Sequence, residues 1–108
     1  MSIENNLEII KLIDTYGKLL TERQNMIIRD YYFDNLTLAE IGDNYGISRQ
    51  AVKDSINKSL KIFNDLEDKL KVCQKQDNIT NELSEIVKLV DSEALKDKIS
   101  KIIDYIRS

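Results

Sequence analysis

Hydrophobic side chains recur along this chain at spacings of three and four residues, the period of an α-helix that is buried on one face. Alternation with a period of two, which marks a half-buried strand, does not occur, and the sequence has no Pro and only 3 Gly. The pattern therefore predicts an all-α protein. The first predicted helix presents one apolar face, formed by Ile3, Leu7, Ile10, Ile13, Tyr16 and Leu20.

Two capping boxes predict where the next helices begin. In a capping box, a Ser or Thr side chain accepts a hydrogen bond from the backbone three residues later, and a Glu or Gln there returns one. Thr21 with Gln24 predicts one such start, and Thr37 with Glu40 predicts another. The second box opens a short helix over residues 38–45.

A turn follows this short helix and joins it to a longer one. Gly46 suits the left-handed conformation that ends helices, and Ser48 suits the cap of the next helix. Gly42 stands where the two helices are expected to approach closely. Two helices joined in this way predict a helix-turn-helix. The inward face of the second helix is predicted to be Val52, Ile56, Leu60, Phe63 and Leu66.

The apolar stripe of that second helix continues past residue 66, and the helix is predicted to reach about Lys75. It would be about 40 Å long, against a radius of gyration of about 13 Å for a compact domain of this size, so it must project or break. Residues 74–78 are polar and predict a linker, and Asp91-Ser92 predicts a break between two C-terminal helices. We expect a helix-turn-helix domain at 1–72 and a helical arm at 79–108. If the long helix projects, its stripe needs cover from the C-terminal helices, a second subunit or both, and we expect a homodimer that involves the region after residue 60.

The composition excludes several function classes. The chain has no His and one cysteine, Cys73, so an internal disulfide, a Cys/His zinc site and His-dependent catalysis are all excluded. We predict no enzyme activity, no metal and no cofactor. Cys73 is predicted to be a buried apolar residue. No apolar run is long enough to span a membrane, and no secretory signal is visible, so the cytoplasm is the expected compartment.

Charge is distributed unevenly. The formal net charge of −3 argues against a general polyanion binder. In contrast, residues 48–61 contain Arg49, Lys53, Lys58 and Lys61 against Asp54 alone. The segment predicted to form the second helix of the helix-turn-helix is therefore basic on an otherwise acidic chain.

The exposed side of that helix supplies the candidate binding residues. In a helix-turn-helix, the first residues of the second helix meet base edges in the major groove. Arg suits guanine, and Gln or Asn suits adenine, so Arg49, Gln50 and Asn57 are candidates for base contacts. Ser48, Lys53 and Lys58 are candidates for phosphate contacts, which position the protein without specifying sequence. The alternative is that these side chains form an ordinary solvated helix face. Tyr31, Tyr32 and Phe33 are predicted to be core rather than a base-stacking platform.

Residues 19–56 resemble the region-4 helix-turn-helix of sigma factors, and more closely the YlxM-like family of small bacterial proteins. The resemblance is carried by Leu20-Thr21, Arg23-Gln24, Tyr31-Tyr32, Leu38, Glu40-Ile41, Tyr45-Gly46 and residues 48–52. It implies an all-helical protein with a regulatory role linked to the signal recognition particle. Gly42 departs from the Ala of many such motifs, which predicts a less stable helix.

Two functions are consistent with these observations. One is a nucleic-acid-binding regulator, with DNA as the expected target and RNA as an open alternative, whose dimer reads half-sites about one turn apart. The other is an interaction module that docks on protein or structured RNA of the signal recognition particle without a DNA operator.

Overall fold

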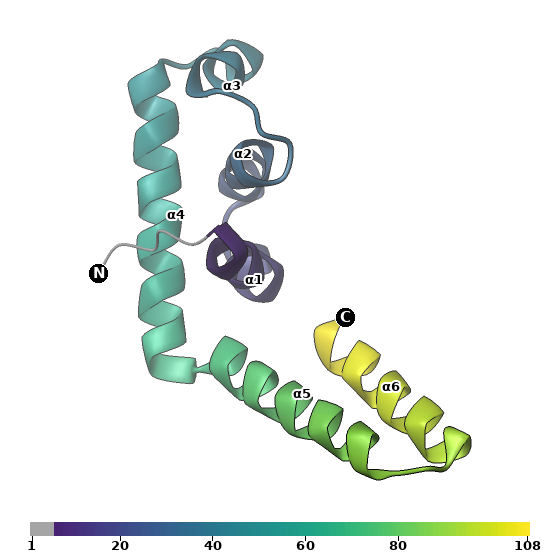
Figure 1. Cartoon of the computed structure of the whole chain (residues 1–108). Coiled ribbons are helices and arrows are strands. Elements are labelled where there is room, and N and C mark those ends of the chain that lie inside the picture. Colours follow the sequence, from purple (N-terminus) through teal and green to yellow (C-terminus); the bar gives the residue numbers. More distant parts are fainter. Residues whose placement is uncertain (1–5) are drawn as a thin grey trace. The chain divides into compact units, whose positions relative to one another are not determined.

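A computed structural model describes residues 6–108 and shows an all-α protein, which confirms the predicted fold class (Figure 1). Its helices divide between two units, Met1–Leu70 and Lys71–Ser108. No described helix combines the length and apolar character that crossing a membrane requires. The elements are α1 (Asn6–Tyr16), the 3-10 helix η1 (Gly17–Leu19), α2 (Glu22–Tyr32), α3 (Leu38–Tyr45), α4 (Arg49–Leu70), α5 (Val72–Leu89) and α6 (Glu93–Arg107).

Both predicted capping boxes are confirmed by their reciprocal hydrogen bonds. The Thr21 hydroxyl accepts from the Gln24 N–H at 3.2 Å, and the Thr21 N–H donates to Gln24 Oε1 at 3.1 Å. Thr37 and Glu40 form the same pair of bonds at 3.1 and 3.0 Å. Because these bonds involve residues only three apart, they set the starts of α2 and α3 locally.

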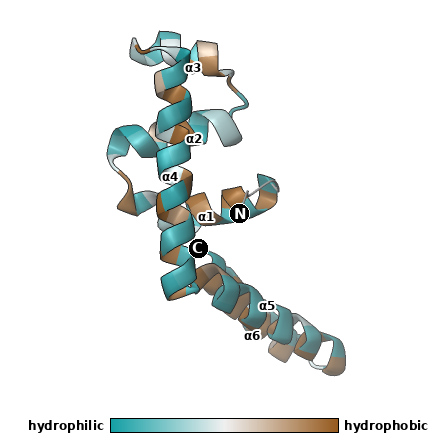
Figure 2. Ribbon diagram, turned by 90° about the vertical axis from the view of Figure 1, so that its left-hand side faces the viewer, coloured by the Kyte–Doolittle hydropathy of each residue, from teal (hydrophilic) through white to brown (hydrophobic). Residues whose placement is uncertain are grey.

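In the first unit, α1, α2 and α3 all pack against one side of α4 (Figure 1). Hydrophobic and hydrophilic residues alternate along α4, as expected for a helix with one buried face (Figure 2). The Tyr16 ring lies 6.4 Å from the Phe63 ring, and its hydroxyl donates to Glu67 Oε1 at 2.6 Å. The buried apolar core consists of Ile9, Leu12, Ile13, Tyr16, Leu20, Ile27, Ile28, Ile41, Val52, Ile56 and Phe63.

The predicted face of the first helix was partly wrong. Ile13, Tyr16 and Leu20 are buried as expected, but Leu7 is 68% exposed, and α1 buries Ile9 and Leu12 instead. Two neighbouring rows of this helix are apolar at spacings of three and four, one beginning at Leu7 and the other at Ile9. Periodicity alone therefore does not show which row is buried. Contact with α2 and α4 selects the row that is buried. Ile3 lies outside the described residues.

Of the two alternatives for the long helix, the structure shows the break, and the linker predicted at residues 74–78 was wrong. Helix α4 ends at Leu70, and Lys71 adopts a left-handed conformation with φ 55°. Helix α5 begins at Val72 and runs straight through residues 74–78. Polar Gln and Lys are good helix formers, so a lack of apolar residues does not by itself end a helix. Cys73, predicted to be buried, is partly exposed.

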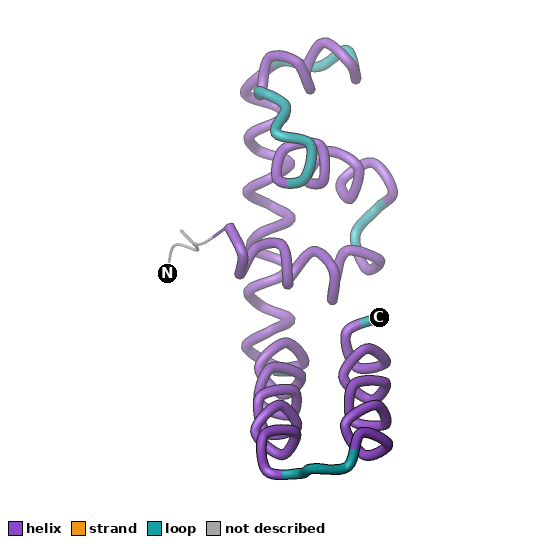
Figure 3. Tube along the Cα trace, turned by 45° about the vertical axis from the view of Figure 1, so that its right-hand side comes forward, coloured by secondary structure: helices purple, strands orange, loops and turns teal. Residues whose placement is uncertain are grey.

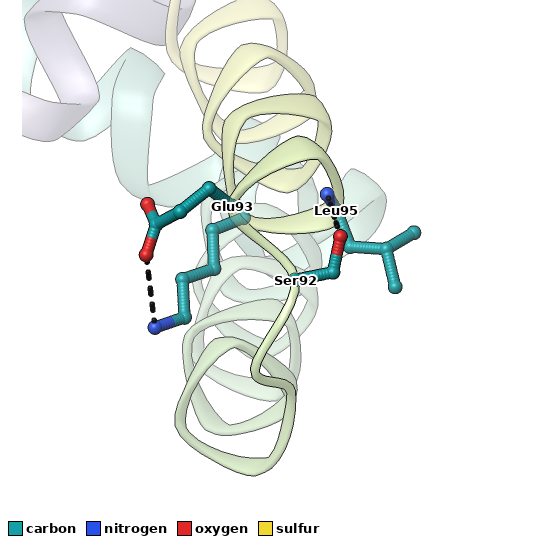
Figure 4. A network of polar contacts seen from close by, with 4 residues as sticks. Ser92, Glu93 and Leu95 are labelled. Carbon is teal, nitrogen blue, oxygen red and sulfur yellow. Dashed lines mark hydrogen bonds and ion pairs between the residues drawn. The ribbon is translucent and has the colours of Figure 1, made fainter.

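The second unit is a hairpin of α5 and α6, which run antiparallel and are joined by a short loop (Figure 3). The predicted break at Asp91-Ser92 is confirmed. Ser92 caps α6, because its hydroxyl accepts from the Leu95 N–H at 3.3 Å (Figure 4). Next to this cap, the Glu93 carboxylate pairs with Lys96 at 3.6 Å.

Candidate nucleic-acid interface

The turn between α3 and α4 is built around the two glycines of the motif. Gly46 has φ 68° and ψ 34°, the left-handed conformation predicted for it. Its N–H donates to the Gly42 carbonyl, and the Ile47 N–H donates to the same oxygen at 2.9 Å. This oxygen therefore accepts both hydrogen bonds that close the end of α3.

Gly42 is buried at the closest approach within this turn. A Cβ placed on Gly42 would lie 2.7 Å from the backbone carbonyl oxygen of Ile47. That distance is shorter than real Cβ contacts permit, and backbone moves less readily than the end of a side chain. The departure from Ala at this position therefore allows the close approach of α3 to the start of α4.

Tyr45 connects α3 to α2 through contacts that no local sequence pattern predicts. Its hydroxyl donates to Asp30 Oδ2 at 2.8 Å, and its carbonyl accepts from Arg23 Nη2 at 3.2 Å. The Arg23 guanidinium also lies 5.7 Å from the centre of the Tyr45 ring. The pKa of the Tyr45 hydroxyl is raised mainly by desolvation and, to a smaller extent, by its hydrogen bond to Asp30. These contacts hold α3, and with it the turn, in a set position relative to α2.

Ser48 forms the predicted cap at the start of α4. Its hydroxyl oxygen accepts from the Ala51 N–H at 3.0 Å, and the residue is exposed. A serine hydroxyl has one proton to donate as well as lone pairs to accept. After capping the helix, Ser48 can therefore still donate a hydrogen bond to a phosphate oxygen.

The exposed side of α4 carries two adjacent rows of polar side chains. Residues four apart lie one turn apart on the same side of a helix, so Arg49, Lys53 and Asn57 form one row. Gln50, Asp54 and Lys58 form the next. All of these residues are exposed, while α4 buries Val52, Ile56, Ser59 and Phe63. We call the two rows together, with Lys61 at their end, the α4 face. The structure thus brings five of the six predicted site residues onto one surface, with Ser48 at its start.

A hydrogen bond within the α4 face was not predicted. The Gln50 side-chain amide donates to Asp54 Oδ1 at 2.9 Å. Paired recognition of adenine needs both the donor and the acceptor of a glutamine amide. Gln50 would therefore have to release Asp54 before it could make that contact. The spacing of four residues between a Gln and an Asp is the sequence signal that could have revealed the pair.

The aromatic cluster near the end of α2 is less buried than predicted. Tyr31 and Tyr32 are half-buried and pack edge to face, with ring centres 5.0 Å apart. Burial raises the pKa of Tyr32. Phe33, expected in the core, is 38% exposed and lies under the Arg29 guanidinium at 5.2 Å. Both tyrosines line a hollow of about 540 Å³ that also includes Arg49.

Comparisons with known proteins identify the family. A family model described as "UPF0122: Putative helix-turn-helix protein, YlxM / p13 like" matches residues 3–106. The chain belongs to the UPF0122 family. A UPF0122 protein of Fusobacterium nucleatum is 35% identical over 104 residues, covering 96% of this chain and 97% of the relative. A UPF0122 protein of Clostridium perfringens is 40% identical over 105 residues, covering 94% and 92%. The resemblance to the YlxM-like family is thereby confirmed.

The family description and the structure agree on the helix-turn-helix of this UPF0122 protein. Across residues 6–108, no group of three or more His, Cys, Asp or Glu side chains is placed to hold a metal ion. The chemistry that the α4 face does offer is hydrogen bonding and positive charge, which suits recognition of a polyanion.

Proposed function

We propose that this protein binds nucleic acid through the α4 face and acts as a small cytoplasmic regulator. DNA is the proposed target, and RNA is the second possibility. One observation carries the proposal: the six predicted contact residues are all exposed, on the cap and the first ten residues of α4, the second helix of the helix-turn-helix. Membership of a family described as helix-turn-helix supports it.

Each residue has a proposed role. Arg49 and Gln50 lie in the first turn of α4, the part of a recognition helix that reaches base edges. Asn57 lies two turns further along the row of Arg49 and can extend that contact. Lys53 and Lys58 contact phosphates, and Ser48 donates to a phosphate at the start of the helix.

Two further parts of the proposal concern assembly and pathway. We propose that the protein is a homodimer that presents two α4 faces to half-sites about one helical turn of DNA apart. We also propose a regulatory role in the signal recognition particle pathway, for which the support is the resemblance to the YlxM-like family.

Selection of bound sequences from random DNA and RNA pools tests the proposal, followed by affinity measurements at several salt concentrations. Arg49→Ala should weaken binding to the selected sequence about tenfold or more and relax its specificity. Lys53→Ala should weaken binding to all sequences and reduce the slope of log affinity against log salt by about 1. Asp54→Asn removes a negative charge while keeping an acceptor for Gln50, so affinity should rise about two- to fivefold.

Lys69→Ala is the matched control, because Lys69 lies on the same helix sixteen residues beyond Lys53 and its loss changes the net charge equally. It should leave affinity nearly unchanged. Two empty pools would contradict the proposal. So would a selected sequence that Arg49→Ala and Lys53→Ala bind as tightly as the unmodified protein does.

A second function, docking on a protein or on structured RNA without a DNA operator, is favoured by one observation. The Gln50 amide is already bonded to Asp54, which leaves a short basic strip with limited base readout. RNA helices are recognised mainly by shape and backbone, which such a strip can contact. A pulldown from native lysate with and without nuclease separates the two. Retention of a protein of the signal recognition particle after nuclease favours docking.

A further inference from the structure

The α5–α6 hairpin has almost no core of its own. Within the unit Lys71–Ser108, Thr80 is the one buried residue of α5, and α6 has none. Units of fewer than about 40 residues rarely fold stably without crosslinks, metals or association. The hairpin is therefore a unit that lacks cover for its apolar surface.

Six large apolar side chains of the hairpin are between 41% and 83% exposed. Three come from each helix, and within each helix they lie at spacings of seven and three, which places them on one side. We call this set the hairpin face. Its members are Ile79, Ile86, Leu89, Leu95, Ile102 and Tyr105.

The two halves of the hairpin face lie on the same side of the hairpin. In α5, the more buried row that includes Thr80 and Val87 faces α6, and in α6 the row of Ile99 and Ile103 faces α5. Successive residues are about 100° apart around a helix axis. Viewed along each helix from its N-terminus, the exposed stripe is therefore rotated about 90° from the inward row, and the direction of rotation is the same in α5 and α6. The two helices run in opposite directions and their inward rows face each other. Rotations of equal size and direction about the two axes therefore place both stripes on the same side of the hairpin.

Charges of opposite sign lie on the two helices of the hairpin face. Glu82 lies within the α5 row and Lys98 within the α6 row, while Glu85 and Lys101 lie at the outer edges of these rows. All four side chains are exposed, and none forms an ion pair with another residue of the described chain. Lys75, which is also exposed, lies one turn before Ile79 on the same side of α5.

The hairpin register places these charges at matching heights. Gln76 Nε2 donates to the Ile106 carbonyl at 3.2 Å, which aligns the two helices. From that pair toward the loop that joins the helices, Glu82 lies six residues beyond Gln76 in α5, and Lys101 lies five residues before Ile106 in α6. Glu85 and Lys98 are likewise nine and eight residues away. By this count each Glu lies within about one helical turn of the level of its Lys, a distance that the two long side chains can span.

We propose that the hairpin face binds the hairpin face of a second copy of this chain, forming a four-helix bundle. The two-fold axis runs parallel to the helices, so α5 of each copy packs against α6 of the other at unchanged height. Glu82 then meets Lys101 of the partner subunit, and Glu85 meets Lys98 of the partner subunit. A perpendicular axis would instead oppose α5 to α5 and Glu to Glu. This inference rests on the dimer of the proposed function and names its surface.

Charge reversal tests both the surface and the arrangement, using the full chain without nucleic acid and light scattering over a range of concentrations. Glu82→Lys/Glu85→Lys should raise the dimer dissociation constant about tenfold or more, and Lys98→Glu/Lys101→Glu should do the same. Combining all four changes in one chain should restore dimerisation. Mixing the two double variants should also restore it, as a heterodimer. Lys88→Glu and Asp104→Lys, on the opposite side of the hairpin, are the controls and should dimerise normally.

The unmodified protein must be a dimer for the inference to stand, so a monomer at every concentration overturns it. A dimer that both double variants leave unchanged also overturns it, because association then uses another surface or the perpendicular axis. Arg49→Ala should dimerise normally. A failure of nucleic-acid binding is thereby distinguished from a failure of the hairpin face.

Discussion

Replacing Gly42 by Ala sets two effects of opposite sign against each other. Ala is favoured over Gly inside a helix by about 1 kcal/mol, so propensity alone predicts a more stable protein. Against this, the new Cβ would lie 2.7 Å from the Ile47 carbonyl oxygen. The sign of the change therefore reports whether the turn between α3 and α4 can open.

The structure indicates that the close contact outweighs propensity. The Ile47 oxygen belongs to the backbone, and the Ile47 N–H is bonded to the Gly42 carbonyl at 2.9 Å. Opening the contact would therefore strain the bond that closes the turn. Overpacking of this kind costs about 1–3 kcal/mol. Subtracting the gain in propensity leaves an expected net destabilisation of about 1 kcal/mol.

Urea unfolding followed by circular dichroism measures this change, read as a lower midpoint at constant slope. Gly17→Ala is the matched control, because its Cβ would lie 2.8 Å from Asn25 Oδ1, a side-chain atom that accepts a hydrogen bond from Arg29 Nε at 3.0 Å. Moving this side chain aside costs about 1 kcal/mol for that bond, which the gain in helix propensity offsets, so the free energy of unfolding should change by less than about 0.5 kcal/mol. An increase of about 1 kcal/mol for Gly42→Ala, the value expected from propensity alone, would contradict this prediction and show that the turn opens freely.

Three further predictions concern local polar groups. The Ser59 hydroxyl is fully buried and finds no hydrogen-bond partner among the described residues, so Ser59→Ala should leave the urea midpoint unchanged or raise stability by about 1 kcal/mol. Thr37→Ala should cost about 1 kcal/mol in the same assay, whereas Thr37→Ser, which keeps the cap, should cost much less. The backbone N–H of Thr37, and then its hydroxyl, lower the pKa of Glu40. The carboxylate therefore stabilises the fold above the ordinary Glu pKa and loses that effect as pH falls through its lowered pKa. The stability difference between the unmodified protein and Glu40→Gln should shrink on acidification, and a constant difference would contradict this.

Features that depend on neighbouring residues were predictable from the sequence. The caps at Thr21, Thr37 and Ser48 join residues three apart, and the left-handed conformation of Gly46 follows from its lack of a Cβ. The exposure of the candidate site was equally predictable, because once Val52 and Ile56 face inward, helix geometry turns Arg49 and Lys53 outward.

Features that depend on distant residues were not predictable. The exposed Leu7 and the buried Ile9 satisfy similar spacings, and only packing against α2 and α4 separates them. The bond between Tyr45 and Asp30 joins helices whose approach no local pattern describes.

Local sequence was enough to predict that this protein is all-helical, where α2 and α3 begin, how α3 ends and which residues of α4 face solvent. These follow from periodicity and from hydrogen bonds within one or two turns. Tertiary structure alone decided which row of α1 is buried, that Lys71 separates α4 from α5, and that Gly42 accommodates the Ile47 carbonyl. Helical patterns specify which faces can be buried, whereas contacts between distant segments select among those faces.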